Sequence, residues 1–117
     1  MEYSIKKLSE IAGVSTRTLR YYDEIGLLKP ARVSSSGYRI YGKKQVDILQ
    51  QILFYKELGM SLDEIKEIIQ NPNFDRINAL KEHKIKLLEK RKQIDMLLDH
   101  VERTLLSVDG GCKMSDK

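Results

Sequence analysis

The sequence of 117 residues predicts a mainly α-helical fold with a small β-wing: a winged helix-turn-helix domain, followed by one long coiled-coil helix. Three observations support this prediction. Two short amphipathic segments lie about three residues apart, with a glycine in the connection. A strand–turn–strand pattern follows them. Finally, apolar residues repeat every seven positions through the last third of the chain.

Capping residues set the expected boundaries of the first two helices. Ser4 is placed to cap the first helix and Gly13 to end it. Ser15 is a suitable N-cap for the second helix, and Gly26 is its expected stop. Two short helices joined by such a turn form a helix-turn-helix.

The second helix has two faces of different character. Leu19 and Tyr22 share one face, which we expect to pack on Leu8 and Ile11 of the first helix. The other face has no evident partner inside the domain, and it carries Arg17, Arg20 and Tyr21, with Thr16 in the first turn.

A β-hairpin is predicted next. Residues 31–33 and 38–41 are strand-like and flank a Ser-Ser-Ser-Gly turn. If Ile40 points inward, the two-residue period of a strand sends Arg39 and Tyr41 outward. A hairpin that directly follows a helix-turn-helix is a wing.

Two further helices complete the expected core. The first ends at Gly59, and its buried side should hold Val46, Leu49, Ile52 and Leu53. The second begins with a capping box from Ser61 to Glu64 and ends at Asn71-Pro72. Its expected buried side consists of Leu62, Ile65, Ile68 and Ile69.

The last helix is expected from about residue 75 to residue 107, with a coiled-coil seam that Lys84 and Arg91 interrupt. The expected dimer-interface residues are Leu80, Leu87, Ile94, Leu98, Val101 and Leu105. Folding of this stripe onto the globular half is the alternative, but a straight seam of this length favours a second copy of the chain. The expected organisation is therefore a domain over 1–72, a dimerisation helix over 73–108, and a flexible tail or linker to an absent effector domain over 109–117.

Charge is distributed unevenly along the chain. Residues 1–60 hold ten Lys or Arg against six Asp or Glu, whereas residues 61–117 hold eleven of each. No acid occurs from Ile25 to Val46. A basic N-terminal half indicates contact with a polyanion.

The unpaired face of the second helix suits the DNA major groove. In a helix-turn-helix the second helix enters that groove with its N-terminal residues first. Arg17 and Arg20 have the chemistry to bind guanine edges or phosphates, and the hydroxyl of Tyr21 can reach a phosphate. Arg39 would flank the groove from the wing, and the helix N-terminus at Ser61 suits a phosphate.

Several motifs in these segments resemble those of a known family. The pieces "GVSTRTLRYYDEIGLL", "GYRIY" and "LGMSLDEIKEII", followed by a long helix, closely resemble the DNA-binding domain of MerR family bacterial transcription regulators. The resemblance covers roughly residues 2–108. The tail "TLLSVDGGCKMSDK" resembles the junction found in the TipA/Mta-type subgroup, in which a drug- or peptide-binding domain follows.

This resemblance implies a homodimer joined by an antiparallel pair of the long helices. Such dimers bind palindromic promoters with an overlong spacer, and they activate by distorting it so that RNA polymerase engages both promoter elements. The residues expected to contact the DNA on this basis are Thr16, Arg17, Thr18, Arg20, Tyr21, Tyr38, Arg39, Lys43, Lys56 and Ser61.

Other classes of site have little support in the sequence. Cys112 stands alone, which argues against a thiolate metal site or a redox cluster. Asp23-Glu24 and Asp63-Glu64 are neighbouring carboxylates that helix capping and solubility explain. No motif of an enzyme occurs, and the aromatic residues suit core packing better than a ligand pocket. We therefore expect no catalytic residue, no metal, no cofactor and no small-molecule ligand in this chain.

The absence of a long apolar segment and of a signal peptide predicts a cytoplasmic protein without membrane contact. Two alternatives to a promoter-binding activator stay open at this point. One is a coiled-coil adaptor for protein interactions, whose basic half is only solvated. The other is an architectural or excisionase-like winged helix that bends DNA. Steep weakening of binding with salt would separate DNA binding from an apolar helix partnership.

Overall fold

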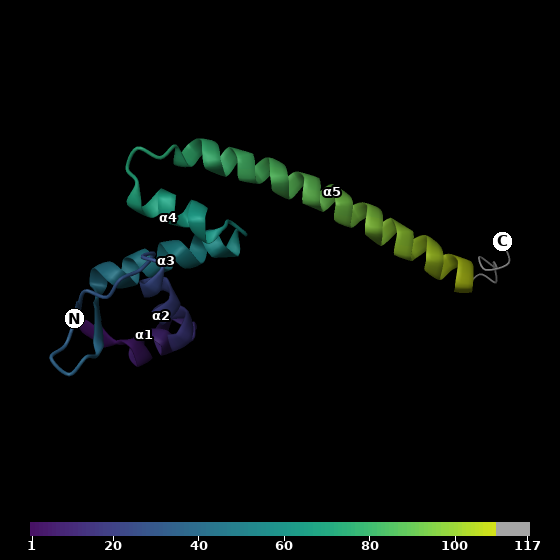
Figure 1. Cartoon of the computed structure of the whole chain (residues 1–117). Coiled ribbons are helices and arrows are strands. Elements are labelled where there is room, and N and C mark those ends of the chain that lie inside the picture. Colours follow the sequence, from purple (N-terminus) through teal and green to yellow (C-terminus); the bar gives the residue numbers. More distant parts are fainter. Residues whose placement is uncertain (110–117) are drawn as a thin grey trace. The chain divides into compact units, whose positions relative to one another are not determined.

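The structure is a computed structural model of the chain, and it describes residues 1–109 (Figure 1). It divides into two compact units, of which the first is Met1–Phe74 and the second begins at Asp75. Its elements in chain order are β1 (Glu2–Ser4), α1 (Ile5–Ala12), α2 (Thr16–Glu24), β2 (Arg32–Val33), β3 (Arg39–Gly42), α3 (Lys43–Glu57), α4 (Leu62–Gln70) and α5 (Arg76–Asp109). Most of the predicted tail, including Cys112, lies outside the described residues. None of the described helices combines the length and the apolar character that crossing a membrane requires.

The predicted capping of α1 and α2 is confirmed. The Ser4 side chain accepts a hydrogen bond from the backbone N–H of Lys7 at 3.1 Å, and Ser15 does the same for Thr18 at 3.0 Å. Each bond satisfies one of the backbone donors that a helix leaves free at its start. At the end of α1 the chain turns through Gly13, whose φ is 73°. The helix-turn-helix therefore has the boundaries that its sequence indicates.

The end of α2 is held by two side chains of α4. The ammonium of Lys66 donates to the carbonyl of Ile25 at 2.8 Å, and the amide of Gln70 donates to the carbonyl of Gly26 at 2.5 Å. These carbonyls follow the last turn of α2, where free acceptors and the negative end of the helix dipole favour a cation. The contacts fix the direction of α2 relative to α4 within the first unit.

Replacing Gly26 by alanine is expected to lower the free energy of unfolding by about 1–2 kcal/mol. Its φ of 75° is unfavourable for a residue with a side chain, and the new methyl would lie 3.4 Å from the Lys66 ammonium. Gly13→Ala is the matched control, because φ is 73° there but no atom lies within 4 Å of the added carbon. Urea denaturation of both variants measures the two losses. A Gly26→Ala variant as stable as wild type would contradict this expectation.

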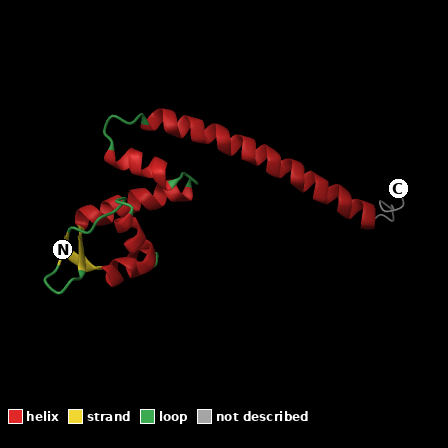
Figure 2. Cartoon of the chain, viewed as in Figure 1, coloured by secondary structure: helices red, strands yellow, loops and turns green. Residues whose placement is uncertain are grey.

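The wing belongs to a three-stranded antiparallel sheet in the order β1-β3-β2. Figure 2 draws its strands in yellow, beside the N-terminus. Strand β1 was not predicted, because three residues beside a helix cap are too short to show an alternating pattern. It pairs with β3 so that Tyr3 lies opposite Tyr41, and β2 pairs on the other side with Arg32 opposite Ile40. The outer strands are joined by an ion pair of 2.8 Å between Arg32 and Glu2. The hydrogen bond from Arg32 lowers the pKa of the Glu2 carboxyl.

The predicted orientation of β3 is wrong. Tyr41 is completely buried, while Ile40 is only half-buried. Strand β3 packs against α1 and α3, and the large ring of Tyr41 fills that side of the sheet. Burial raises the pKa of the Tyr41 hydroxyl. Arg39, two residues earlier on the same face of the strand, therefore faces the helices as well.

The core of the first unit combines all four of its helices. Its fully buried aliphatic residues include Leu8, Leu19, Leu49, Ile52 and Ile65. Each was expected to be buried, but Ile11 was wrongly included with them, since it is 55% exposed near the end of α1. Other expected core positions lie at the edge and are only partly buried, namely Val46, Leu53, Leu62, Ile68 and Ile69. Tyr55 is 6% exposed, which agrees with the expectation that the aromatic residues suit core packing.

The second unit consists of α5 in the described residues. Its 34 residues make a helix about 51 Å long at the standard rise per residue. Leu87, Ile94, Leu98, Val101 and Leu105 are between 42% and 58% exposed, and Leu80 is half-buried. No second element in the described part of this unit is available to cover the stripe.

Candidate nucleic-acid interface

The candidate interface is built first on the exposed face of α2. Arg17, Arg20 and Tyr21 are exposed, with 49% of Tyr21 accessible, while Leu19 and Tyr22 on the other face are buried. The Arg20 guanidinium donates to the Thr16 hydroxyl at 3.3 Å. Arg17 forms no hydrogen bond or ion pair with any described residue, so its donors are free for a ligand.

Thr18 has a different role from its neighbours. Its hydroxyl lies 2.9 Å from the Ser15 hydroxyl, and its backbone N–H donates to the same oxygen. Thr18 is half-buried. The pair closes the first turn of α2, so the structure places Thr18 in the cap of the helix as well as at the edge of the exposed face.

The wing contributes Tyr38 and Arg39, which the structure places in different surroundings. Tyr38 is 70% exposed at the hairpin turn, where its backbone N–H donates to the Ser34 hydroxyl at 3.0 Å. Arg39 does not point freely into solvent. Its Nε donates to the carboxylate of Asp23 at 2.8 Å, so the wing is tied to the end of α2.

Asp23 joins α2 to the wing in the candidate interface, although the sequence alone did not indicate this contact. Its carboxylate also accepts from the Lys29 ammonium at 3.4 Å, and its side chain is only 19% exposed. The hydrogen bond from Arg39 is the main reason that the pKa of Asp23 lies below its ordinary value. The available signal was an acid at the end of a helix whose exposed face is otherwise basic, directly before the acid-free stretch.

The depressed pKa of Asp23 predicts a loss of stability in acid. A carboxyl whose pKa is lower in the folded than in the unfolded chain stabilises the fold above its unfolded value, which is 3.8, and loses that contribution as the pH falls through the folded value. We expect chemical denaturation at a series of pH values to show this decline. In Asp23→Asn the decline should be shallower, with Glu24→Gln as the exposed neighbouring control. Identical acid profiles for wild type and Asp23→Asn would contradict the assignment.

The remaining predicted contacts lie on α3 and α4. Lys43 begins α3 and is 3.6 Å from Asp47 one turn later, with 83% of its side chain exposed. Lys56 is exposed in the last turn of α3. Ser61 caps α4, and the capping box with Glu64 is confirmed, because the Glu64 carboxylate accepts from both the N–H and the hydroxyl of Ser61. The start of α4 is therefore occupied by a carboxylate of its own chain.

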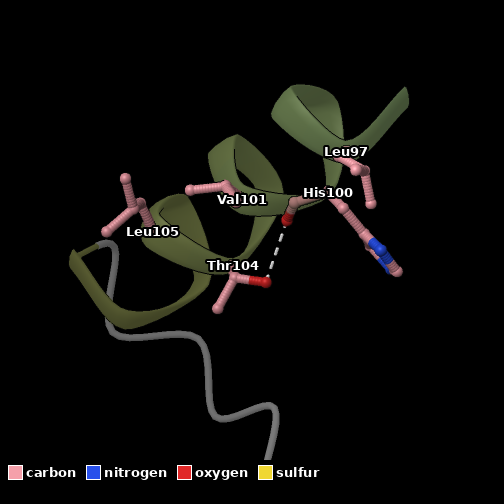
Figure 3. Close-up of a pocket in the computed structure, with 5 residues that line it drawn as sticks. All are labelled: Leu97, His100, Val101, Thr104 and Leu105. Carbon is pink, nitrogen blue, oxygen red and sulfur yellow. Dashed lines mark hydrogen bonds between the residues drawn. The ribbon is translucent and has the colours of Figure 1, made fainter. Parts of the chain in front are cut away.

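The predicted dimer-interface residues form an apolar stripe along α5. Near its C-terminal end the stripe widens, and Figure 3 shows Leu97, Val101 and Leu105 around a shallow hollow. The Thr104 hydroxyl donates to the carbonyl of His100 at 2.9 Å and so bonds within its own helix. Among residues 1–109, no group of three His, Cys, Asp or Glu is arranged to hold a metal ion.

The structure brings the predicted residues of α2 and the wing together on the first unit, joined by the Asp23–Arg39 pair. Lys56 and Ser61 flank the short connection between α3 and α4. A helix-turn-helix with an exposed arginine face, an attached basic wing and an appended long helix defines a DNA-binding transcription regulator of the winged helix-turn-helix class.

The chain belongs to the MerR family. Residues 3–72 match the family model described as MerR HTH family regulatory protein, and residues 46–104 match the one described as MerR, DNA binding. Together the two matches span the helix-turn-helix, the wing, the α3–α4 pair and most of α5.

Two relatives support the predicted subgroup. The chain is 49% identical over 117 residues to the HTH-type transcriptional activator mta of Bacillus subtilis, covering all of this chain and 46% of the relative. It is 44% identical over 86 residues to the HTH-type transcriptional activator TipA of Streptomyces coelicolor, covering 73% of this chain and 34% of the relative. The chain thus spans less than half the length of these relatives.

Solved structures agree with this placement. The crystal structure of MtaN, the N-terminus of the Bacillus subtilis multidrug transporter activator, matches with a TM-score of 0.79 and 48% identity, covering 90% of this chain and 99% of that one. The cryo-EM structure of an EcmrR–DNA complex in EcmrR-RPo matches with a TM-score of 0.84 and 27% identity, covering 96% of this chain and 41% of that one.

Proposed function

We propose that this chain acts as a homodimeric, sequence-specific transcription activator that binds a palindromic promoter and distorts its overlong spacer. The observation that carries the proposal is the free arginine face of α2 joined to a basic wing, on a chain of the MerR family. By shaping the spacer, the dimer would influence RNA polymerase through the promoter rather than through a catalytic step. Such a regulator works where the genome lies, in the cytoplasm of a bacterial cell.

In this proposal the exposed residues of α2 bind in the major groove of the DNA. Arg17 is the base-reading or phosphate-binding arginine, because it has no partner within the described chain. Arg20 acts beside it, held by Thr16 at 3.3 Å, and Tyr21 offers its hydroxyl to a phosphate. Thr18 supports them by closing the cap with Ser15.

The wing and the α3–α4 pair supply contacts to the DNA backbone. Tyr38 and Arg39 would contact phosphates from the hairpin, and Lys43 and Lys56 from α3. Ser61 would contribute the N-terminus of α4, where a phosphate has to share the backbone donors with Glu64. Contacts from several elements are needed, because bending a duplex costs about 1–6 kcal/mol.

A second copy of the chain is the proposed partner of α5. The charges of this helix favour an antiparallel arrangement. Residues 81–92 contain six Lys or Arg and two acids, whereas residues 93–108 contain three acids and one Arg. Antiparallel pairing places the basic half of each helix beside the acidic half of the other, while parallel pairing would oppose like charges.

Selection from a pool of random duplexes about three helical turns long tests the proposal. The expected result is an enriched inverted repeat, bound by two chains, whose affinity falls steeply as salt rises because Lys and Arg displace counterions. A bent but unspecific complex would instead indicate an architectural protein. Absence of any DNA binding would leave the coiled-coil adaptor as the better interpretation. Transcription with purified polymerase, from a promoter carrying the repeat in its spacer, then tests activation.

A further inference from the structure

The connection between α2 and the wing suggests a positioning role for Asp23. The guanidinium of Arg39 is bound to Asp23 through Nε alone, and its two Nη groups have no hydrogen-bond partner among the described residues. An arginine held in this way presents a fixed pair of donors on its far side. Two donors at that spacing match the oxygens of a phosphate.

We propose that Asp23 is a positioning residue for DNA binding, which holds Arg39 by its Nε so that both Nη groups point to one phosphate of the DNA backbone. The inference rests on the proposed function and names one residue of its mechanism. Asp23 would not touch the DNA itself, and its negative charge would be used to orient a positive one.

The surroundings of the pair support this role. The side chains of Asp23 and Arg39 are 19% and 32% exposed, so solvent screens their interaction less than that of an ion pair on an open surface. The hydroxyl of Tyr41 is buried on the same face of β3 and has no hydrogen-bond partner within residues 1–109, so it does not compete for the carboxylate. Lys29 is the other ion-pair partner of Asp23 among the described residues, at 3.4 Å, and 70% of the Lys29 side chain is exposed.

The pair also links the two parts of the interface. Asp23 lies in the last turn of α2, and Arg39 begins β3, sixteen residues later. A rigid link between them sets the distance between the groove-binding helix and the wing. Holding a donor in its bound orientation before association removes part of the entropy cost of binding.

The test compares Asp23→Asn with Glu24→Gln on the duplex selected by the wild-type chain. Each removes one negative charge from the end of α2, which by charge alone should strengthen DNA binding. We expect Glu24→Gln to bind as well as wild type or better. Asp23→Asn should bind about tenfold more weakly, because a charge-assisted hydrogen bond no longer orients Arg39. The salt dependence of Asp23→Asn should be shallower by about one phosphate contact per protomer.

A double-mutant cycle distinguishes positioning from a general effect on folding. If Asp23 acts through Arg39, adding Asp23→Asn to Arg39→Ala should cause no further loss of affinity. Lys29→Ala should have a smaller effect than Asp23→Asn. The proposal is overturned if Asp23→Asn binds as tightly as Glu24→Gln, or if it weakens Arg39→Ala as much as it weakens wild type.

If Asp23→Asn folds poorly, a measurement on the wild-type chain still tests whether Arg39 stays bound to Asp23. In NMR spectra the Nε–H of Arg39 should give a slowly exchanging signal both in the free protein and with the selected duplex. Loss of this signal on binding DNA would mean that Arg39 leaves Asp23, which contradicts the proposal. If wild type itself binds no duplex, the proposed function fails first, and the two failures are therefore distinguishable.

Discussion

Replacing Leu98 by glutamate is expected to convert the proposed homodimer to single chains and to abolish tight DNA binding. Leu98 lies in the middle of the apolar stripe of α5 and is 58% exposed in the single chain. Burial of a fully exposed leucine contributes about 1.5–3 kcal/mol, and because Leu98 is 58% exposed, its two copies together would contribute about 2–4 kcal/mol. A glutamate in the seam would in addition have to bury a charged group in an apolar contact, which costs free energy. Sedimentation equilibrium at micromolar concentration measures the association.

Met96→Glu is the matched control for this variant. Met96 is 65% exposed, and two residues from Leu98 it is turned about 200° around the same helix. The Met96→Glu variant introduces the same charge as Leu98→Glu, but on the side of the helix that faces away from the seam. We expect this variant to stay dimeric and to bind DNA as wild type does. A dimeric Leu98→Glu variant would show that the stripe is not the dimer interface.

Replacing Arg17 by alanine is expected to weaken binding to the selected duplex by about 1–3 kcal/mol for each protomer. A homodimer carries the change twice, so the affinity of the whole complex should fall by about 2–6 kcal/mol. The reason is that Arg17 is exposed and unpartnered in the first turn of α2, where a helix-turn-helix reads the groove. Because it supports nothing in the fold, the free energy of unfolding should not change.

Gel-shift titration at a fixed salt concentration measures this loss, and thermal unfolding provides the check on stability. Lys92→Ala is the control, because it removes one positive charge from α5, away from the seam. Discrimination between the selected repeat and a scrambled duplex should fall with Arg17→Ala if Arg17 contacts a base. It should stay constant if Arg17 binds a phosphate only. Unchanged affinity would remove Arg17 from the interface.

Much of the fold was predictable, because its boundaries depend on local chemistry. Ser4, Ser15 and Ser61 were identified as caps from the sequence, and each forms the expected bond to a backbone N–H. Such bonds join residues only three positions apart, so that the sequence shows both partners at once. The seven-residue repeat of α5 is likewise a local pattern, and the helix is present over the predicted span.

The errors concern contacts between distant segments. Strand β1 could not be predicted from its own three residues, because it is defined by its pairing with β3, in which Glu2 lies opposite Gly42. The period of β3 showed that residues alternate between two faces, but not that the ring of Tyr41 rather than Ile40 would be buried. Asp23 was explained as a residue for helix solubility, because its partner Arg39 lies sixteen residues further along the chain. The exposed arginine face of α2 could be predicted from the sequence, whereas the contact between α2 and the wing could be seen only in the folded structure.

The division of charge along α5 has a consequence for which chains can associate within one cell. A rod that is basic in one half and acidic in the other is complementary to its own reversed copy. A related rod with charges of both signs mixed along its length, or with the opposite polarity, would meet repulsion at several points. If α5 pairs in the proposed antiparallel arrangement, selectivity for an identical chain over related regulators would reside in the charged side chains of α5. Each promoter would then be bound by a dimer of two identical chains rather than by a dimer of two different regulators.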